Sequence, residues 1–208
     1  MWKAAFCRQP LQYRESWKTL SGCMSFKVFC DTVTVILECI SKHWKGYIPM
    51  ITINCIGNDS IQLDISSLQG ANLNGLELHR AILSHQDVSY SSLVCTNLRG
   101  AELFQTNLSH SVLTSALLMT AYLQHANLEY SNLSQARCAG ADFQGSNLSQ
   151  STFTQADIWK ADFTGANLKG VIMLCERISD AIFTNAIYDD STIWPSFFDP
   201  ALSGAIKV

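Results

Sequence analysis

The stretch "ADFTGANLKG", from Ala161 to Gly170, contains one five-residue phrase twice: Ala-Asp-Phe-Thr-Gly and then Ala-Asn-Leu-Lys-Gly. A period of five matches neither the 3.6-residue period of an α-helix nor the two-residue period of a β-strand. When the phrase is extended in both directions from Phe163, an apolar residue recurs at every fifth position from Leu63 to Phe183 without a change of register. This regularity indicates an internal repeat, which decides the fold before any other feature of the chain.

The positions within the repeated phrase differ in size and polarity. The residue two before each apolar centre is small, usually Ala, Ser or Thr, and the residue just before the centre is often Asn or Asp. A turn every five residues would send the centre and the small residue to the axis and leave three positions facing water. We therefore expect Leu123, Phe143 and the small Ala161 to point inward, and we expect Cys138, which stands at a centre, to be buried and unreactive. The exceptions to the small residue lie toward the two ends: Ile61, Leu76, Gln86, Val171 and Glu176.

This phrase resembles the A(D/N)Lxx repeat of the pentapeptide-repeat family, over roughly residues 61–188. The resemblance implies an all-β fold, a right-handed quadrilateral parallel β-helix in which four repeats form one square coil. Six full coils are then expected, with a partial seventh: 61–80, 81–100, 101–120, 121–140, 141–160 and 161–180. Successive coils should hydrogen-bond through their backbones at a spacing of about 4.8 Å.

The repeat divides the chain into three parts. Residues 1–60 form an N-terminal extension and cap, in which 25–42 fits a helix about as well as a strand and 47–56 alternates like a strand that leads into the first coil. Residues 61–188 form the β-helix. Residues 189–208 carry Trp194 among other aromatic residues and two prolines, so we expect a C-terminal cap that covers the open end. This tail is similar to those of cyanobacterial members of the family.

Composition limits the classes of function. The chain of 208 residues has a net charge of −3 and only 15% charged residues, which argues against a nucleic-acid partner. The eight cysteines form no C-x-x-C pair, and the N-terminus lacks the apolar segment of a signal peptide, so we expect a cytoplasmic protein with free thiols. The most apolar segment is too short and too charged to span a membrane.

No catalytic constellation, metal-ligand spacing or glycine-rich phosphate loop is present in the sequence. His85 and His125 fall in one outward column, but Gln105 lies between them, so their separation should be about 9.6 Å. Two ligands at that distance cannot share a zinc ion. We therefore expect a protein without enzymatic activity and without a cofactor.

The outward positions divide unequally among the four faces of the predicted rod. The face that contains Leu63 carries acidic residues, and the face that contains Leu78 carries most of the basic residues of the repeat. At the corner between these two faces several apolar side chains are assigned outward beside two arginines, which is typical of a protein-interaction site. This candidate surface, called the corner patch below, consists of Arg99, Phe104, Leu117, Met119, Tyr122, Arg137 and Trp159. A second outward column stacks Tyr90, His110 and Tyr130, which we interpret as a stabilising ladder.

Two functions compete at this stage. In the first, the rod is a scaffold that binds an unknown protein partner or a second copy of itself through the corner patch. In the second, it acts like the quinolone-resistance members of the family, which imitate duplex DNA and occupy DNA gyrase. Those members are markedly acidic rods, whereas five basic residues lie on one face of this chain: Arg80, Arg99, Arg137, Lys160 and Arg177. The charge pattern favours the scaffold.

Overall fold

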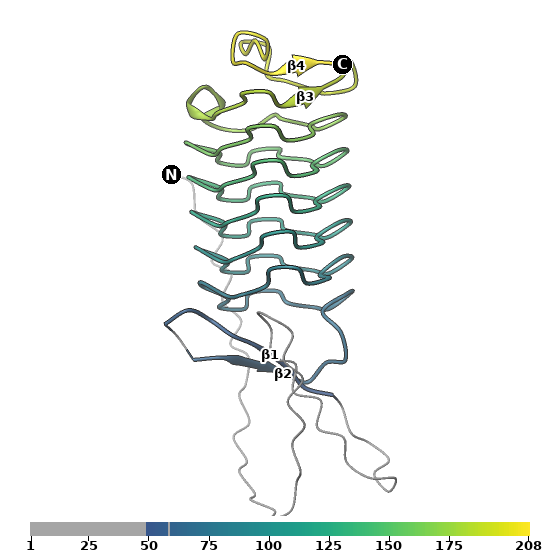
Figure 1. Ribbon diagram of the computed structural model, residues 1–208, viewed down its shortest axis with the longest axis vertical. Helices are drawn as coiled ribbons and strands as arrows, with labels where there is room; N and C mark the ends of the chain where they lie inside the picture. Colours follow the sequence, from purple (N-terminus) through teal and green to yellow (C-terminus); the bar gives the residue numbers. More distant parts are fainter. Residues whose placement is uncertain (1–48, 58) are drawn as a thin grey trace, which may run out of the picture.

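A computed structural model describes residues 49–57 and 59–208 of the chain. In these residues the backbone forms a stack of similar coils, with a short hairpin at one end and a two-stranded closure at the other (Figure 1). The hairpin consists of β1 (Ile51–Ile53) and β2 (Ile61–Leu63), and the closure contains β3 (Ile187–Tyr188) and β4 (Ile206–Lys207). One 3-10 helix, η1, covers Ile178–Asp180. The interpretation of residues 25–42 lies outside the described residues.

Backbone pairing between coils follows the five-residue repeat. Residues twenty positions apart form parallel bridges along the stack, so that Tyr122 bridges both Glu102 and Asp142. The amide of Tyr122 donates to the carbonyl of Ala101 at 2.9 Å, and that of Leu123 donates to the carbonyl of Asp142 at 2.7 Å. One coil thus contains four repeats and four sides, which is the parallel β-helix that the sequence predicts.

From Gly70 to Gly170, each side ends in a turn whose last residue has a positive φ. In the repeat that contains Leu123, the amide of Ala126 donates to the carbonyl of Leu123 at 3.0 Å, and His125 between them has φ of 57°. Glycine adopts this left-handed conformation without cost, whereas other residues are strained there. Most of the turns nevertheless carry a residue with a side chain, Thr120 among them with φ of 55°.

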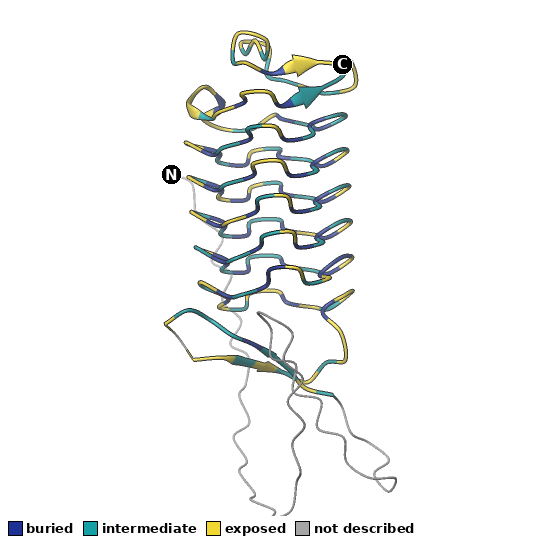
Figure 2. Cartoon of the chain, in the orientation of Figure 1, coloured by how far each residue is buried: buried dark blue, intermediate teal, exposed yellow. Residues whose placement is uncertain are grey.

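The core is a set of columns along the axis. The centres from Leu73 to Phe183 are buried, and the small residues two positions earlier, such as Ala121 and Ala161, are also fully buried (Figure 2). Cys138 is fully buried as predicted. At several positions where the small residue is Ser or Thr, its hydroxyl donates to a main-chain carbonyl, as Thr96 Oγ1 does to the carbonyl of Leu73 at 2.8 Å. The buried hydroxyls of Ser146 and Ser151 have no such partner. The interior therefore contains few polar groups without a partner.

The first predicted coil, 61–80, is not a complete coil. Ile61–Leu63 is instead the strand β2, which pairs antiparallel with β1 in the register Ile51↔Leu63, and Leu63 is only partly buried. Parallel stacking begins with the bridge Asn72↔Ser92. The alternation of Ile61, Leu63 and Ile65 has the period of a strand, and pairing with β1 satisfies it better than a square turn does. The strand expected within 47–56 is β1.

The twenty-residue register between coils is interrupted twice near the C-terminal end, and the later interruption is the bridge Ile172↔Ile193, which spans twenty-one residues. Asp157 bridges Glu176, which is nineteen residues away instead of twenty, although Met173 and Ile178 remain buried at their expected positions. Glu176 occupies a position that elsewhere holds a small buried residue. A carboxylate cannot be buried there without a partner, so the chain turns at Cys175 and leaves Glu176 exposed.

The C-terminal end of the core is covered by aromatic side chains. Phe143, Phe163 and Phe183 stack face to face, and Trp194 meets Phe183 edge-on with ring centroids 5.5 Å apart. β4 then pairs in parallel with β3 in the register Ile187↔Ile206. These contacts cover the last coil.

Candidate interaction surface

The corner patch is built by residues on either side of one turn in successive coils. Leu117 lies in the ladder between Asn97 and Arg137, and Tyr122 follows it in the next repeat. Phe104, Leu117 and Met119 are half-buried, whereas Arg99, Tyr122, Arg137 and Trp159 are exposed. All seven side chains thus lie on the outside of the coils. The side chains of Phe104, Leu117 and Met119 are less accessible to solvent than the other four.

Tyr122 is the central residue of this surface. It is 51% exposed and lines two shallow hollows. One hollow, of about 220 Å³, contains Phe104, Glu102 and Gln124 beside Tyr122. The other, of about 460 Å³, contains Arg99 beside Tyr122. The structure therefore brings Arg99, Phe104 and Tyr122 to one place.

Trp159 forms a separate group with two cations. Ala139 lies between Met119 and Trp159 in the same outward column. The Nζ atom of Lys160 lies 4.6 Å from the Trp159 ring centroid, and Cζ of Arg177 lies 5.3 Å from it. Arg177 also forms an ion pair with Asp157, which fixes its guanidinium against the indole. The repeat places Trp159 outward but does not predict this cation–π arrangement, although the position of Arg177 one coil beyond Asp157 is a signal for it.

Two histidine-containing clusters lie on the neighbouring corners. The rings of Tyr90, His110 and Tyr130 stack with centroids 4.7 Å and 4.9 Å apart, so the predicted ladder is present. His85 and His125 meet the Phe104 ring edge-on from opposite sides, at centroid distances of 5.4 Å and 5.8 Å. Phe104 therefore separates His85 from His125, the two histidines of one outward column.

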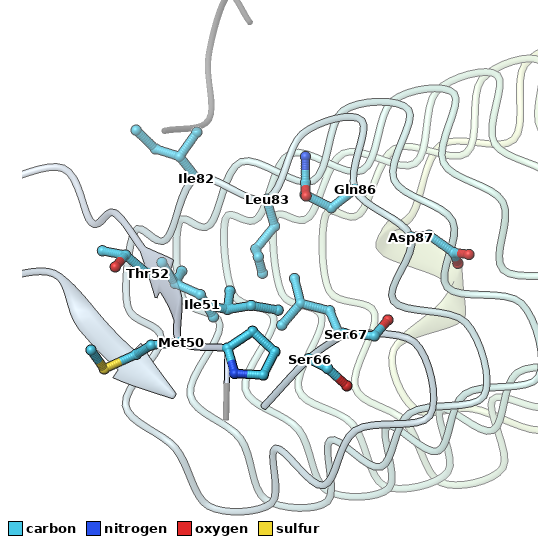
Figure 3. A pocket seen from close by; sticks show the side chains of 12 residues that line it. Met50, Ile51, Thr52, Ser66, Ser67, Ile82, Leu83, Gln86 and Asp87 are labelled. Carbon is cyan, nitrogen blue, oxygen red and sulfur yellow. The ribbon is translucent and has the colours of Figure 1, made fainter. Parts of the chain in front are cut away.

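A further pocket lies at the N-terminal end, between the β1–β2 hairpin and the first coils (Figure 3). Its volume is about 280 Å³, and residues of the hairpin and of the coil face one another across it, including Met50, Ile51, Leu68 and Leu83. The repeat does not predict this pocket, because its register assigns Ile61–Leu63 to a coil and not to a hairpin.

The buried thiols have no activating group. Burial raises the pKa of Cys138 far above its ordinary value, and the negative charge of Asp157 adds to this effect. Burial likewise raises the pKa of Cys175 to about 12. A reactive cysteine requires a lowered pKa, so neither thiol is suited to nucleophilic chemistry.

Within residues 49–57 and 59–208, His, Cys, Asp and Glu side chains do not gather into any group of three that could hold a metal ion. In the same residues no helix has the length and apolarity needed to cross a membrane.

In the described residues these features define a class, a β-helical solenoid built from five-residue repeats. A family model described as pentapeptide repeats matches residues 96–135 and 131–170, in eight copies. The chain belongs to the pentapeptide-repeat family. Membership of this family implies that the coils wind in the right-handed sense.

Solved structures of the family are similar to this chain over part of its length. A pentapeptide repeat protein from Nostoc Pcc 7120 is 28% identical over 49% of this chain and 84% of its own, with a TM-score of 0.47. A pentapeptide repeat protein from the cyanobacterium Cyanothece 51142 is 22% identical over 61% of this chain and 89% of its own, with a TM-score of 0.46. A pentapeptide repeat protein from the Arabidopsis thaliana thylakoid lumen is 30% identical over 47% of this chain and 68% of its own, with a TM-score of 0.26. No curated protein matches the chain.

Proposed function

We propose that the chain is a non-enzymatic scaffold that binds a partner protein through the corner patch. The observation that carries this proposal is the position of Tyr122, half exposed between Arg99 on one side and Phe104 on the other. Tyr, Trp and Arg residues contribute most of the binding energy at protein interfaces, especially where apolar contacts are surrounded by charges. The stacked coils hold the backbone of these residues in place before a partner binds, which lowers the entropic cost of association.

The proposed partner is a protein, either foreign or a second copy of this chain, in the cytoplasm. A flat surface with two shallow hollows suits another protein better than a small substrate, because small ligands require deeper pockets that cover most of their surface. The mixed charge of the patch should make the association only moderately sensitive to salt.

A double substitution tests this proposal. We expect Tyr122→Ala with Trp159→Ala to keep the β-helix circular dichroism of the parent while weakening its association at least tenfold. The matched control is Tyr90→Ala with Tyr130→Ala, which removes two exposed aromatic rings from another corner. Self-association is measured by sedimentation, and a foreign partner by quantitative cross-linking in the native host. Equal binding by the double variant and the parent would show that the corner patch is not the contact.

The alternative is a DNA-mimicking protein that occupies DNA gyrase. QnrB1, a plasmid-mediated fluoroquinolone resistance protein, is 19% identical over 66% of this chain, with a TM-score of 0.37, which is too low to argue for a shared partner. Exposed Arg80, Arg99 and Arg137 on one face oppose the uniformly acidic surface that mimicry of DNA requires. A gyrase supercoiling assay separates the two functions, and we expect no inhibition by this protein.

A further inference from the structure

The larger hollow beside Tyr122 has a polar lining that the sequence analysis did not predict. Its volume is about 460 Å³, and it opens where the loop that follows β1 reaches the first coils. Ile56 of that loop lines it, and the Ile56 amide donates to the Arg80 carbonyl at 2.9 Å. Besides Ile56, the lining consists of His79, Arg80, Arg99, Gly100, Glu102, Thr120 and Tyr122.

The hollow exists because a glycine interrupts a column of side chains. Gly100 lies between Arg80 and Thr120 at the last turn position, with φ of 60°. A Cβ atom on Gly100 would lie 3.5 Å from Cγ of Arg80 and 3.8 Å from Oγ1 of Thr120, so a larger residue would fill the floor of the hollow. Arg80 instead extends from this floor toward the loop, where its Nη1 atom would lie 3.8 Å from a Cβ on Gly57.

The hollow has an excess of positive charge that the described residues leave unpaired. Within residues 49–57 and 59–208 the ion pairs are Arg177–Asp157 and Lys207–Asp190, so neither Arg80 nor Arg99 belongs to one. Glu102 is the one carboxylate in the lining, against two guanidinium groups. The hydroxyls of Thr120 and Tyr122 add two further donors, and they have no hydrogen-bond partner in the described part of the chain.

We propose that this hollow binds a phosphate group. Guanidinium groups match the geometry of phosphate oxygens and donate two parallel, charge-assisted hydrogen bonds to them. Two such groups together with two hydroxyl donors can satisfy several phosphate oxygens at once. The volume exceeds that of phosphate alone, so it also accommodates the group that carries the phosphate. The phosphate is carried by a modified side chain of the partner protein. This inference therefore rests on the proposed function, in which the corner patch binds a partner protein.

Titration of the whole chain with two probes tests the proposal. The probes are inorganic phosphate and phenyl phosphate, which stands for a phosphotyrosine side chain, and binding is followed through the arginine Nε–H signals in nuclear magnetic resonance. We expect Arg99→Gln and Arg80→Gln each to weaken binding about tenfold, which corresponds to losing one charge-assisted contact. Glu102→Gln should strengthen binding, because it removes a like charge. Lys169→Gln, which removes one positive charge outside both the hollow and the corner patch, is the matched control and should bind as the parent does.

The two probes distinguish the source of the phosphate. Tighter binding of phenyl phosphate supports a phosphate carried by a side chain, and equal binding of the two probes supports a free phosphate. The proposal is overturned if the parent binds neither probe, if Lys169→Gln weakens binding as much as Arg99→Gln, or if Glu102→Gln weakens it. Loss of partner binding in the Tyr122→Ala, Trp159→Ala variant, without any phosphate binding by the parent, would overturn this inference and leave the proposed function standing.

Discussion

The ring of Phe143 lies parallel to that of Phe163 in the next coil, with centroids 4.9 Å apart and an angle of 2° between the planes. Both rings are fully buried. Because the contact is repeated along the axis, each phenyl group supports its neighbours above and below, and the loss of one leaves a cavity inside a column that cannot collapse without shifting a whole coil.

We expect Phe143→Ala to lower the free energy of unfolding by about 3–5 kcal/mol, through lost burial and the cavity that remains. Gln105→Ala is the control, because Gln105 is exposed and should change stability by less than about 0.5 kcal/mol. Urea denaturation followed by circular dichroism measures both. Similar losses in the two variants would contradict the inward assignment of the repeat centre.

The second prediction concerns the small buried column. Ala161 is fully buried, and the backbone around it has no room for a longer side chain. Ala161→Leu should therefore cost about 1–3 kcal/mol by overpacking. Ala139→Leu places the same side chain at a half-buried outward position and should cost much less. If both variants melt at the temperature of the parent, the small residues are not constrained by packing.

Thr120 provides a test of backbone strain. It is the β-branched residue among the described non-glycine residues with positive φ, at 55°. Thr120→Gly should raise the free energy of unfolding by about 0.5–1 kcal/mol, because relief of left-handed strain exceeds the entropy that glycine adds to the unfolded chain. Asn185→Gly, at φ of 58°, should change little, since asparagine tolerates this conformation. Thermal unfolding of the two variants would refute this account if Thr120→Gly were the less stable.

The repeat register predicted most of the fold because burial at every fifth position admits one arrangement. Leu73 to Phe183 and the small residues before them needed no information beyond the sequence. The hairpin was not predicted because Leu63 fits both the five-residue repeat and the two-residue alternation of a strand. Only its pairing with Ile51–Ile53 decides between the two structures. The slip at Glu176 had a signal, a charged residue at a small position, but its consequence depends on where the chain can turn.

For the candidate site, the sequence predicts only which residues share an outward column of the coils. The register placed Tyr122 and Arg99 outward on neighbouring faces, and both lie there. The hollow between them depends on the absence of a side chain at Gly100 and on a loop from β1 that returns to the same corner. Side-chain direction and long-range loop placement of this kind are not fixed by a local repeat. The cation–π contacts of Lys160 and Arg177 with Trp159 also depend on side-chain direction.

The thiols should differ in reactivity according to burial. Cys138 is fully buried and its pKa is raised, whereas Cys95 is half-exposed. In the folded protein at pH 8 we expect iodoacetamide to label Cys95 many times faster than Cys138, with all cysteines labelled in denaturant. Peptide mass mapping after short labelling times measures the rates. Rapid native labelling of Cys138 would show that the coils open locally at this point.

The last prediction concerns a ladder of hydrogen-bonded side chains along one face. The amides of Asn107, Asn127, Asn147 and Asn167 each donate to the residue one coil earlier, and the first of them donates to Asp87 at 3.0 Å. Hydrogen bonds from the Ser89 side chain, then from the Ser89 backbone amide and from Asn107, lower the pKa of the Asp87 carboxyl. The folded-state pKa of Asp87 thus lies below the unfolded value of about 3.9, so the stabilisation that its carboxylate provides is complete above pH 3.9. This stabilisation is lost as the pH falls through the folded-state pKa.

Asp87→Asn should therefore be less stable than the parent at pH 7, and the difference should shrink as the pH approaches 2. Thermal unfolding of parent and variant across this range measures it. A difference that stays constant with pH would mean that the Asp87 charge does not stabilise the ladder.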